Sequence, residues 1–216
     1  MEGYENLGRC NAGRAVLARD KTSASASTPS LCAIKILHKT WLIENDEVAR
    51  ARGEREAFRA TTMMEDEKEG RGQDFLVALR ACFQTGTSLC FVMEYAGGED
   101  LLTRLQRRPF GLDETRYARL RPTSFSSFPS LFYNTDPEHC SFYAAETCAG
   151  LAFLHGRGVL YRNLKLDNIV VSPDGHVRLI NYFFCKGGMG HGEGTRTFCG
   201  TQEFMAPEVS LFPTYI

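Results

Sequence analysis

The chain lacks an excess of charge of one sign and a long apolar run, and we expect no signal peptide at its N-terminus. Its 25 Lys and Arg residues are matched by 26 Asp and Glu residues, and the formal net charge of -1 gives no electrostatic basis for nucleic-acid binding. No apolar run approaches the ~18 residues that a membrane span needs. The N-terminal residues Met-Glu-Gly-Tyr-Glu-Asn do not resemble a signal peptide. We therefore expect an ordinary globular protein without a nucleic-acid partner and without a membrane span.

Cysteine is present, but not in a metal-binding pattern. None of the eight cysteines is spaced C-x-x-C, and none falls in a Cys/His cluster. A zinc site or a disulfide framework would require such spacing or an oxidising compartment. Free, buried thiols in a reducing compartment are the preferred interpretation, and we expect a cytoplasmic protein. With 216 residues, of which 43% are hydrophobic, the chain can bury a sizeable core as one or two domains.

A stretch late in the chain predicts a β-hairpin. Ile169–Val171 and Val177–Ile180 are rich in β-branched residues, and the Ser-Pro-Asp-Gly sequence at 172–175 favours a turn, because proline presets φ and glycine accepts φ > 0. A hairpin returns the chain to the place where it left. Asn168 and Asn181, which flank the hairpin, are therefore expected to lie close together. Such a pair could contribute to one metal site from two distant positions.

Motifs around this hairpin occur in the order and at the spacing of protein kinase motifs. They are Tyr161-Arg162-Asn163-Leu164-Lys165 with Asn168 (H-R-D-L-x-x-x-N in the family), Asn181-Tyr182-Phe183 (D-F-G) and Ala206-Pro207-Glu208 (A-P-E). The chain therefore resembles a eukaryotic protein kinase catalytic domain. Tyr161, Thr197–Thr201 and Cys185–Met189 resemble the AGC group, protein kinase N first and protein kinase C next.

The resemblance implies an α+β, two-lobed kinase-like fold. Residues 1–95 are expected to form an N-terminal lobe, built from an antiparallel sheet and one helix. Residues 96–216 are expected to form a mainly helical C-terminal lobe, truncated after the A-P-E motif. A polar insertion near 63–73 is interpreted as a disordered surface excursion. A Ser- and Phe-rich insertion near 116–140 is either a partner-binding segment or a translated intron, and we favour the intron as a hypothesis.

Motifs in the first half of the chain indicate where a nucleotide would bind. Gly8 and Gly13 match two glycines of the kinase glycine-rich loop, although Cys10 replaces the middle glycine. A Cβ at position 10 restricts the turn and crowds the approach of backbone amides to phosphates. The predicted buried strand Leu31–Leu37 contains one lysine and matches the V-A-I-K motif. The nucleotide-binding residues implied by the resemblance are Gly8, Gly13, Ala15, Ala33, Lys35, Glu54, Glu94 and Ala96.

Glu54 is the expected partner of Lys35. Residues 46–59 predict a helix, and Glu54 falls on its apolar stripe with Ala51 and Phe58. An acid on an apolar face needs a cation, and the resemblance implies that Lys35 and Glu54 together position the α- and β-phosphates. The alternative is a solvated helix face, on which Glu54 pairs with an arginine of its own helix.

Further elements are predicted from apolar runs. Strands are expected at Phe75–Leu79 and Leu89–Met93, followed by a hinge at 94–96 that resembles the adenine-binding hinge. A short helix is expected at Glu99–Arg107. A longer helix is expected from Phe142 to Leu154, with an apolar stripe through Phe142, Ala145, Ala149 and Phe153.

Two aspartates that define kinase chemistry are absent. Asn163 stands where the family has the aspartate that accepts the substrate hydroxyl proton, and Asn181 stands where it has the magnesium-binding aspartate. An amide keeps the shape of a carboxylate but neither its charge nor its basicity. Losing a general base typically lowers the rate by about 10²–10⁴. With Asn168 and Asn181 both neutral, ATP is expected to bind weakly and Mg²⁺ poorly.

Other parts of the family pattern are retained. Lys165 matches the lysine that contacts the γ-phosphate, Thr197 matches the activation-loop phosphorylation site, and Arg162 matches the arginine that would receive that phosphate. The residues matching the internal hydrophobic column of kinases all remain apolar or aromatic: Phe58, Leu79, Tyr161 and Tyr182.

Three functions are consistent with these residues. The first is a serine/threonine-kinase-like pseudokinase that acts by binding nucleotide, protein partners, or both. The second is a serine/threonine protein kinase that transfers the γ-phosphoryl group of ATP with reduced activity. The third is a non-functional fragment or a mis-spliced product. Partners would be ATP and proteins that contact apolar surface of the C-terminal lobe.

Overall fold

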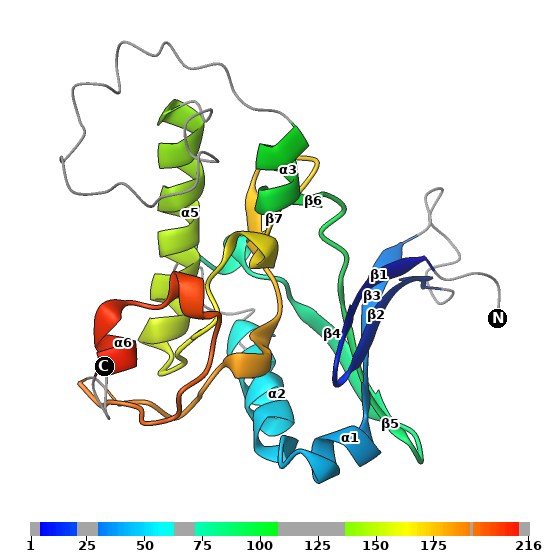
Figure 1. Ribbon diagram of the computed structural model, residues 1–216. Coiled ribbons are helices and arrows are strands. Elements are labelled where there is room, and N and C mark those ends of the chain that lie inside the picture. Colours follow the sequence, from blue (N-terminus) through cyan, green and yellow to red (C-terminus); the bar gives the residue numbers. More distant parts are fainter. Residues whose placement is uncertain (1–4, 21–29, 63–71, 108–136, 191, 212–216) are drawn as a thin grey trace.

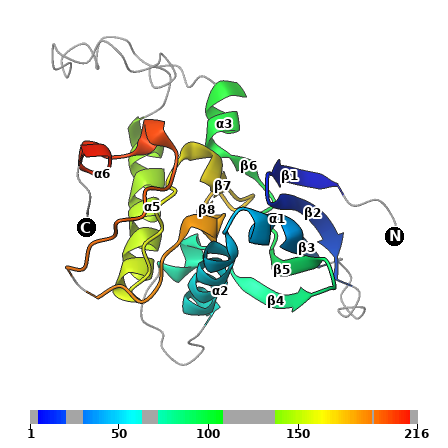
Figure 2. The same cartoon turned by 60° about the horizontal axis from the view of Figure 1, so that its bottom comes forward.

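The computed structural model describes residues 5–20, 30–62, 72–107, 137–190 and 192–211, and these form an α+β fold (Figure 1). A five-stranded sheet lies on one side and helix α5 (Pro137–Gly156) on the other. Helix α2 (Val48–Thr62) and the hairpin of β7 and β8 lie between them, as Figure 2 shows from a second direction. Most of the two predicted insertions falls outside the described residues.

The large sheet forms the N-terminal lobe. Its strands run in the spatial order β1-β2-β3-β5-β4, and every neighbouring pair is antiparallel, as the resemblance implied. Alternation along β3 buries Ala33, Lys35 and Leu37 on one side of the strand. The strands are β1 (Asn6–Cys10), β2 (Gly13–Arg19), β3 (Leu31–His38), β4 (Leu79–Gln84) and β5 (Ser88–Glu94).

Two helices accompany this sheet where the sequence predicted one. The short helix α1 (Lys39–Glu44) follows β3, and α2 is the predicted helix. The predicted stripe on α2 is confirmed, because Ala51, Glu54 and Phe58 are all buried. Helix α1 was missed because its six residues are too few for a helical repeat to be visible in the sequence.

The strand predicted at Phe75–Leu79 is wrong. Gln73–Phe75 form a turn of 3-10 helix, η1, and β4 begins only at Leu79. The apolar residues between them pair elsewhere: Leu76 forms a parallel bridge with Leu179, and the Val77 N–H donates to the Leu179 carbonyl at 3.1 Å. This run is apolar because it packs beside β8, and not because it belongs to the large sheet.

The second half of the chain contains a small sheet, one long helix and several single turns. The predicted hairpin is confirmed, with Val171 opposite Val177 and Ile169 opposite Leu179. The three-stranded sheet has the order β6-β7-β8. Besides α5, the elements are β6 (Glu99–Asp100), α3 (Leu101–Arg107), η4 (Leu166–Asn168), β7 (Ile169–Val171), β8 (Val177–Leu179), η5 (Tyr182–Phe184), η6 (Gln202–Phe204) and α6 (Pro207–Leu211).

The buried face of α5 is not the apolar stripe that the sequence predicted. Phe142 is 44% exposed and Ala145 is exposed, whereas the neighbouring Tyr143 and Glu146 are buried. Small or apolar residues occur on every face of this helix, so the sequence repeat does not single out the inward face. Phe153 does lie in the core, as predicted.

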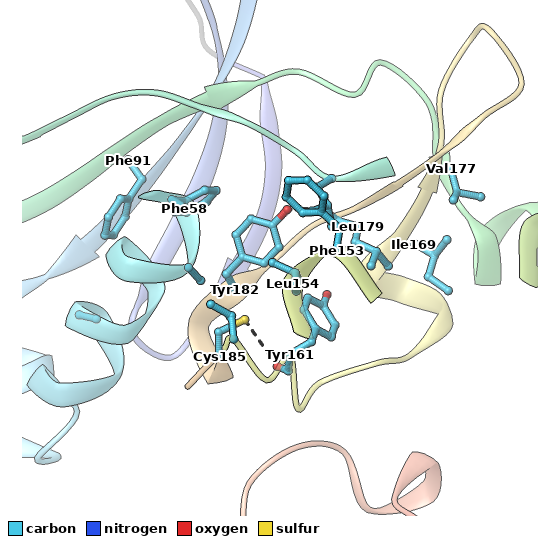
Figure 3. Packing of buried hydrophobic residues seen from close by; sticks show 14 of the residues in the cluster. Phe58, Phe91, Phe153, Leu154, Tyr161, Ile169, Val177, Leu179, Tyr182 and Cys185 are labelled. Atoms are coloured by element: carbon cyan, nitrogen blue, oxygen red, sulfur yellow. Dashed lines mark hydrogen bonds between the residues drawn. The ribbon is translucent and has the colours of Figure 1, made fainter. Parts of the chain in front are cut away.

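Three aromatic rings link α2 to the hairpin and to the segment after α5 (Figure 3). Tyr182 packs edge-on against Phe58, with ring centroids 4.6 Å apart, and against Tyr161, with centroids 6.0 Å apart. Burial raises the pKa of both tyrosine hydroxyls well above the usual value, so both remain protonated donors. The Tyr182 hydroxyl donates to the Val77 and Leu179 carbonyls, and the Tyr161 hydroxyl donates to the Ile180 carbonyl. Leu79 also packs against this core, so all members of the predicted column contribute to it.

Two expectations from composition can be compared with the described residues. The seven cysteines whose side chains the structure describes carry free thiols, as expected, although Cys10, Cys82 and Cys148 are exposed and not buried. No helix in these ranges combines the length and the apolarity that a membrane crossing requires.

An ion-paired hydrogen bond joins α5 to the turn before β8. His176 Nδ1 lies 2.5 Å from Glu146 Oε1, and the second oxygen of Glu146 accepts the Val177 N–H at 2.9 Å. The hydrogen bond and the negative charge of Glu146 raise the pKa of His176 above 6.5. Asp174 adds to this effect and Arg178 opposes it.

We expect this contact to make stability depend on pH. The pKa of His176 is higher in the folded than in the unfolded protein, so its contact with Glu146 stabilises the fold fully below about pH 6.5. This stabilisation is lost as the pH rises through the raised pKa. The melting temperature should therefore fall more between about pH 6 and about pH 8 for the wild type than for His176→Gln. His155→Gln, at an exposed histidine near the end of α5, is the control. Equal pH dependence of wild type and His176→Gln would contradict the assignment.

Candidate functional site

A cleft of about 360 Å³ separates the large sheet from the small one, and this volume lies within the range of small-molecule sites. Its walls come from the β1–β2 hairpin, β3, the chain after β5, η4 and both ends of the β7–β8 hairpin. It is lined by Leu7, Gly8, Arg9, Cys10, Arg14, Ala15, Ala33, Lys35, Val77, Met93, Glu94, Tyr95, Ala96, Gly97, Gly98, Asp100, Asp167, Asn168, Val170, Ile180 and Asn181.

Most predicted nucleotide-binding residues line this cleft. Gly13 and Glu54 do not: Gly13 lies at the hairpin turn, and Glu54 lies behind Lys35. Gly13 is nevertheless required, because a Cβ there would lie 1.8 Å from the Ile36 carbonyl oxygen. Gly98 is required for the same reason, since a Cβ there would lie 1.7 Å from the Val171 carbonyl oxygen.

The predicted pair of Lys35 and Glu54 is formed. Lys35 Nζ lies 2.6 Å from Glu54 Oε1. The Lys35 side chain is 11% exposed, towards the cleft, and the Glu54 side chain is fully buried. Glu54 Oε2 has no hydrogen-bond partner within the described part of the chain, so Lys35 is the main compensation for a buried carboxylate. The Lys35 ammonium also lies 5.0 Å from the centre of the Phe183 ring.

Lys35 begins a chain of hydrogen bonds through three asparagines. Its ammonium donates to Asn181 Oδ1 at 3.3 Å, and Asn181 Nδ2 donates to Asn168 Oδ1 at 3.3 Å. Asn168 Nδ2 then donates to the backbone carbonyl of Asn163 at 2.8 Å. The two residues that flank the hairpin are therefore close together, as their positions predicted. This series of hydrogen bonds runs from a charged donor, Lys35, to a backbone acceptor, the Asn163 carbonyl.

The donors at this point do not fit Mg²⁺. Mg²⁺ in proteins favours carboxylate oxygens and phosphates in octahedral geometry, and the flanking residues offer only neutral amides. One of the two amide oxygens, Asn168 Oδ1, already accepts the Asn181 Nδ2–H. Within the described ranges, no three His, Cys, Asp or Glu side chains converge as metal ligands would.

Asn163 lies in the loop before the hairpin. Asn163 is buried, and its Oδ1 accepts the Thr201 hydroxyl at 3.5 Å. Lys165, predicted to contact a phosphate, lies outside the lining of the cleft, and its ammonium is 3.7 Å from Asp167 Oδ2. The amide oxygen of Asn163 can orient a hydroxyl group but cannot take its proton.

Arg162 connects this loop to the segment after the hairpin. It adopts φ of 59°, and its side chain donates to the Phe184 carbonyl at 2.8 Å and to the Thr195 hydroxyl at 3.3 Å. Thr195 is buried, whereas Thr197, the predicted phosphorylation site, is exposed. Thr197 lies two positions after Thr195, the threonine that Arg162 contacts, and its exposed hydroxyl is compatible with modification. Thr197 stays a prediction.

Several lining residues were not identified from the sequence. Arg9 and Arg14 are partners in the β1–β2 register, and both line the cleft. Asp100 and Asp167 line it as well. The sequence indicated these four residues only through their charge and their position close to motif residues. A charged residue beside a turn usually just faces solvent, so this indication was weak.

Comparisons with known proteins agree with this geometry. The protein kinase domain family model matches residues 1–211. The chain is 42% identical over 209 residues to a protein kinase C-like protein of Cochliobolus heterostrophus, covering 97% of this chain and 15% of that protein. It is 41% identical to protein kinase C of Aspergillus fumigatus, over 97% of this chain and 16% of that protein. It is 34% identical over 203 residues to protein kinase C zeta type of Oryctolagus cuniculus, with coverage of 94% and 28%. The chain thus spans a small part of the length of these relatives.

Removing one partner of the buried ion pair should be more harmful than removing both. Lys35→Met leaves the Glu54 carboxylate buried without a cation, and we expect the free energy of unfolding in urea to fall by about 3 kcal/mol. The double variant Lys35→Met/Glu54→Met should recover at least about 1 kcal/mol of this loss. Glu56→Met, at an exposed acid on the same helix, should change stability little. A double variant that is no more stable than Lys35→Met would contradict the role of the pair.

Proposed function

The chain belongs to the protein kinase family as a serine/threonine protein kinase C-like domain, and we propose that it is a pseudokinase: it binds a nucleotide such as ATP and acts through protein contacts. The observation that carries this proposal is the preserved Lys35–Glu54 pair beside a proton-accepting position occupied by Asn163. The binding half of the site is assembled, whereas the half that performs proton transfer lacks its base.

The cleft suits a nucleotide in two respects. Ala33 and Val170 give it apolar walls that come from the two different sheets, which is suited to a planar base. The chain at 94–96 passes along it and offers backbone groups, whose hydrogen bonding does not depend on side-chain identity. Lys35 then supplies a positive charge, already positioned by Glu54, to a phosphate group.

The proposed protein contacts are supported by exposed apolar side chains. Leu164, Phe198 and Phe204 are 39%, 53% and 49% exposed. Leu164 follows Asn163, and Phe198 and Phe204 flank Thr201, whose hydroxyl donates to Asn163 Oδ1. Large exposed apolar side chains that gather on one part of a surface are typical of protein interaction sites. A domain that binds nucleotide without transferring phosphate could signal through such a surface.

Nucleotide binding is the first test of the proposal. ATP should raise the melting temperature of the wild type, and Lys35→Met should weaken ATP binding at least about tenfold, because a charge-assisted hydrogen bond to a phosphate is lost. Lys39→Met is the matched control, since Lys39 lies outside the cleft and its ammonium donates to the Thr85 carbonyl at 2.6 Å. An unchanged melting temperature at saturating ATP would contradict nucleotide binding. A chain without any cooperative melt would favour the fragment interpretation.

Phosphoryl transfer is the second test. The double variant Asn163→Asp/Asn181→Asp restores a proton acceptor and a metal-binding charge, and we expect it to label a generic peptide about 10²–10⁴ faster than the wild type. Lys35→Met, purified in the same way, measures contamination by host kinases. Wild-type labelling as fast as that of the double variant, and abolished by Lys35→Met, would show an active kinase instead.

A further inference from the structure

The orientation of the Asn181 amide is fixed by its neighbours. Lys35 has only N–H donors, so the amide oxygen of Asn181 must face it. The Asn181 NH₂ group therefore faces Asn168 Oδ1, while the Asn168 NH₂ group faces the Asn163 carbonyl. Only this arrangement places each of these two NH₂ groups against an oxygen.

This arrangement excludes a cation between the two side chains. A divalent ion bridging Asn168 and Asn181 would need an oxygen from each, but Asn181 presents the positive end of an N–H dipole. Rotating the amide to expose its oxygen would place its NH₂ group against the Lys35 ammonium, donor against donor, at the 3.3 Å that now separates Lys35 Nζ from Asn181 Oδ1. Lys35 is itself held by Glu54, so it does not move away at low cost. The Asn181 NH₂ group thus presents to Asn168 Oδ1 the positive charge that a bound cation would present.

Positive charge is available from the β1–β2 hairpin as well. Arg9 and Arg14 are cross-strand partners, and both line the cleft. Like charges directly opposite each other destabilise a strand pair, and an anion between them removes that penalty. Neither arginine forms an ion pair within the described residues.

The acids of the cleft are engaged or lie at its other end. Asp100 accepts the Thr103 N–H at 2.8 Å and the Thr103 hydroxyl at 2.6 Å, and Asp167 pairs with Lys165. Glu94 lies at the end of β5, where the base of a nucleotide is proposed to bind. The part of the cleft near Lys35 and the hairpin therefore favours an anion.

We propose that the cleft binds a nucleoside triphosphate as the metal-free polyanion, with Lys35, Arg9 and Arg14 offsetting the charge that Mg²⁺ would otherwise offset. This inference rests on the proposed nucleotide-binding function and defines the form of its ligand. Binding requires no covalent step and no divalent cation. Magnesium in solution should compete for the nucleotide, because it converts the free polyanion into a complex that the site does not prefer.

Calorimetric titration with ATP, in excess EDTA and in excess MgCl₂, tests this inference. The wild type should bind ATP at least as tightly in EDTA as in MgCl₂. Asn181→Asp should reverse this order, with Mg²⁺ tightening binding about tenfold or more, because a carboxylate replaces the amide that faces Asn168. Asn45→Asp is the matched control, since Asn45 follows α1, is exposed and does not line the cleft. It should behave as the wild type does.

A second pair of variants tests the source of the positive charge. Arg9→Gln and Arg14→Gln should each weaken ATP binding in EDTA several-fold, and Arg19→Gln, at an exposed position of β2 outside the cleft, should not. This measurement remains decisive if Asn181→Asp does not fold.

Wild-type binding that appears only with Mg²⁺, or tightens with it, would overturn the metal-free form and leave nucleotide binding intact. Absence of ATP binding under both conditions would overturn the proposed function and this inference with it.

Discussion

The contact between Lys35 and Glu54 is the interaction on which the site depends. It joins β3 to α2 through a carboxylate that is fully buried and has one oxygen without a partner in the described ranges. Helix α2 is held in the required position by apolar contacts, because Phe58 packs on Tyr182 and α2 packs against η5. Gly53 contributes to this close approach, since a Cβ there would lie 2.8 Å from the Cys185 carbonyl oxygen. The polar pair and the aromatic core thus stabilise the same helix position.

The asparagines show how a site can keep its geometry after losing its charge. Asn181 directs its amide NH₂ group at the side-chain oxygen of Asn168, Asn168 directs its own at the backbone carbonyl of Asn163, and Lys35 supplies the first donor. Carboxylates at these places would bring oxygens face to face and would require a cation between them. Amides satisfy one another directly. The amide at position 181 therefore leaves a continuous series of hydrogen bonds in place of a metal site, which is why we interpret the site as built for binding.

The sequence predicted those features that depend on local chemistry and on motif spacing. The turn at 172–175, the burial of Glu54 and the proximity of Asn168 and Asn181 follow from turn residues, helical periodicity and the return of a hairpin. The run at 75–79 was misassigned because an apolar segment beside β8 has the same composition as a strand. The inward face of α5 was misassigned because that helix is apolar on several faces. The hydrogen-bond direction through Asn181 depends on distances between side chains, which no motif encodes.

The backbone at Asn181 limits which residues this position can accommodate. Its φ of 64° lies in the left-handed region, which asparagine and aspartate tolerate better than most residues with a side chain. Replacing an acid by its amide therefore changes electrostatics without changing conformational preference. A β-branched or bulky residue would instead strain the start of η5 and displace Tyr182 from the aromatic core. The scaffold can thus exchange a charged form for a neutral one at this point by altering one functional group within the same backbone conformation.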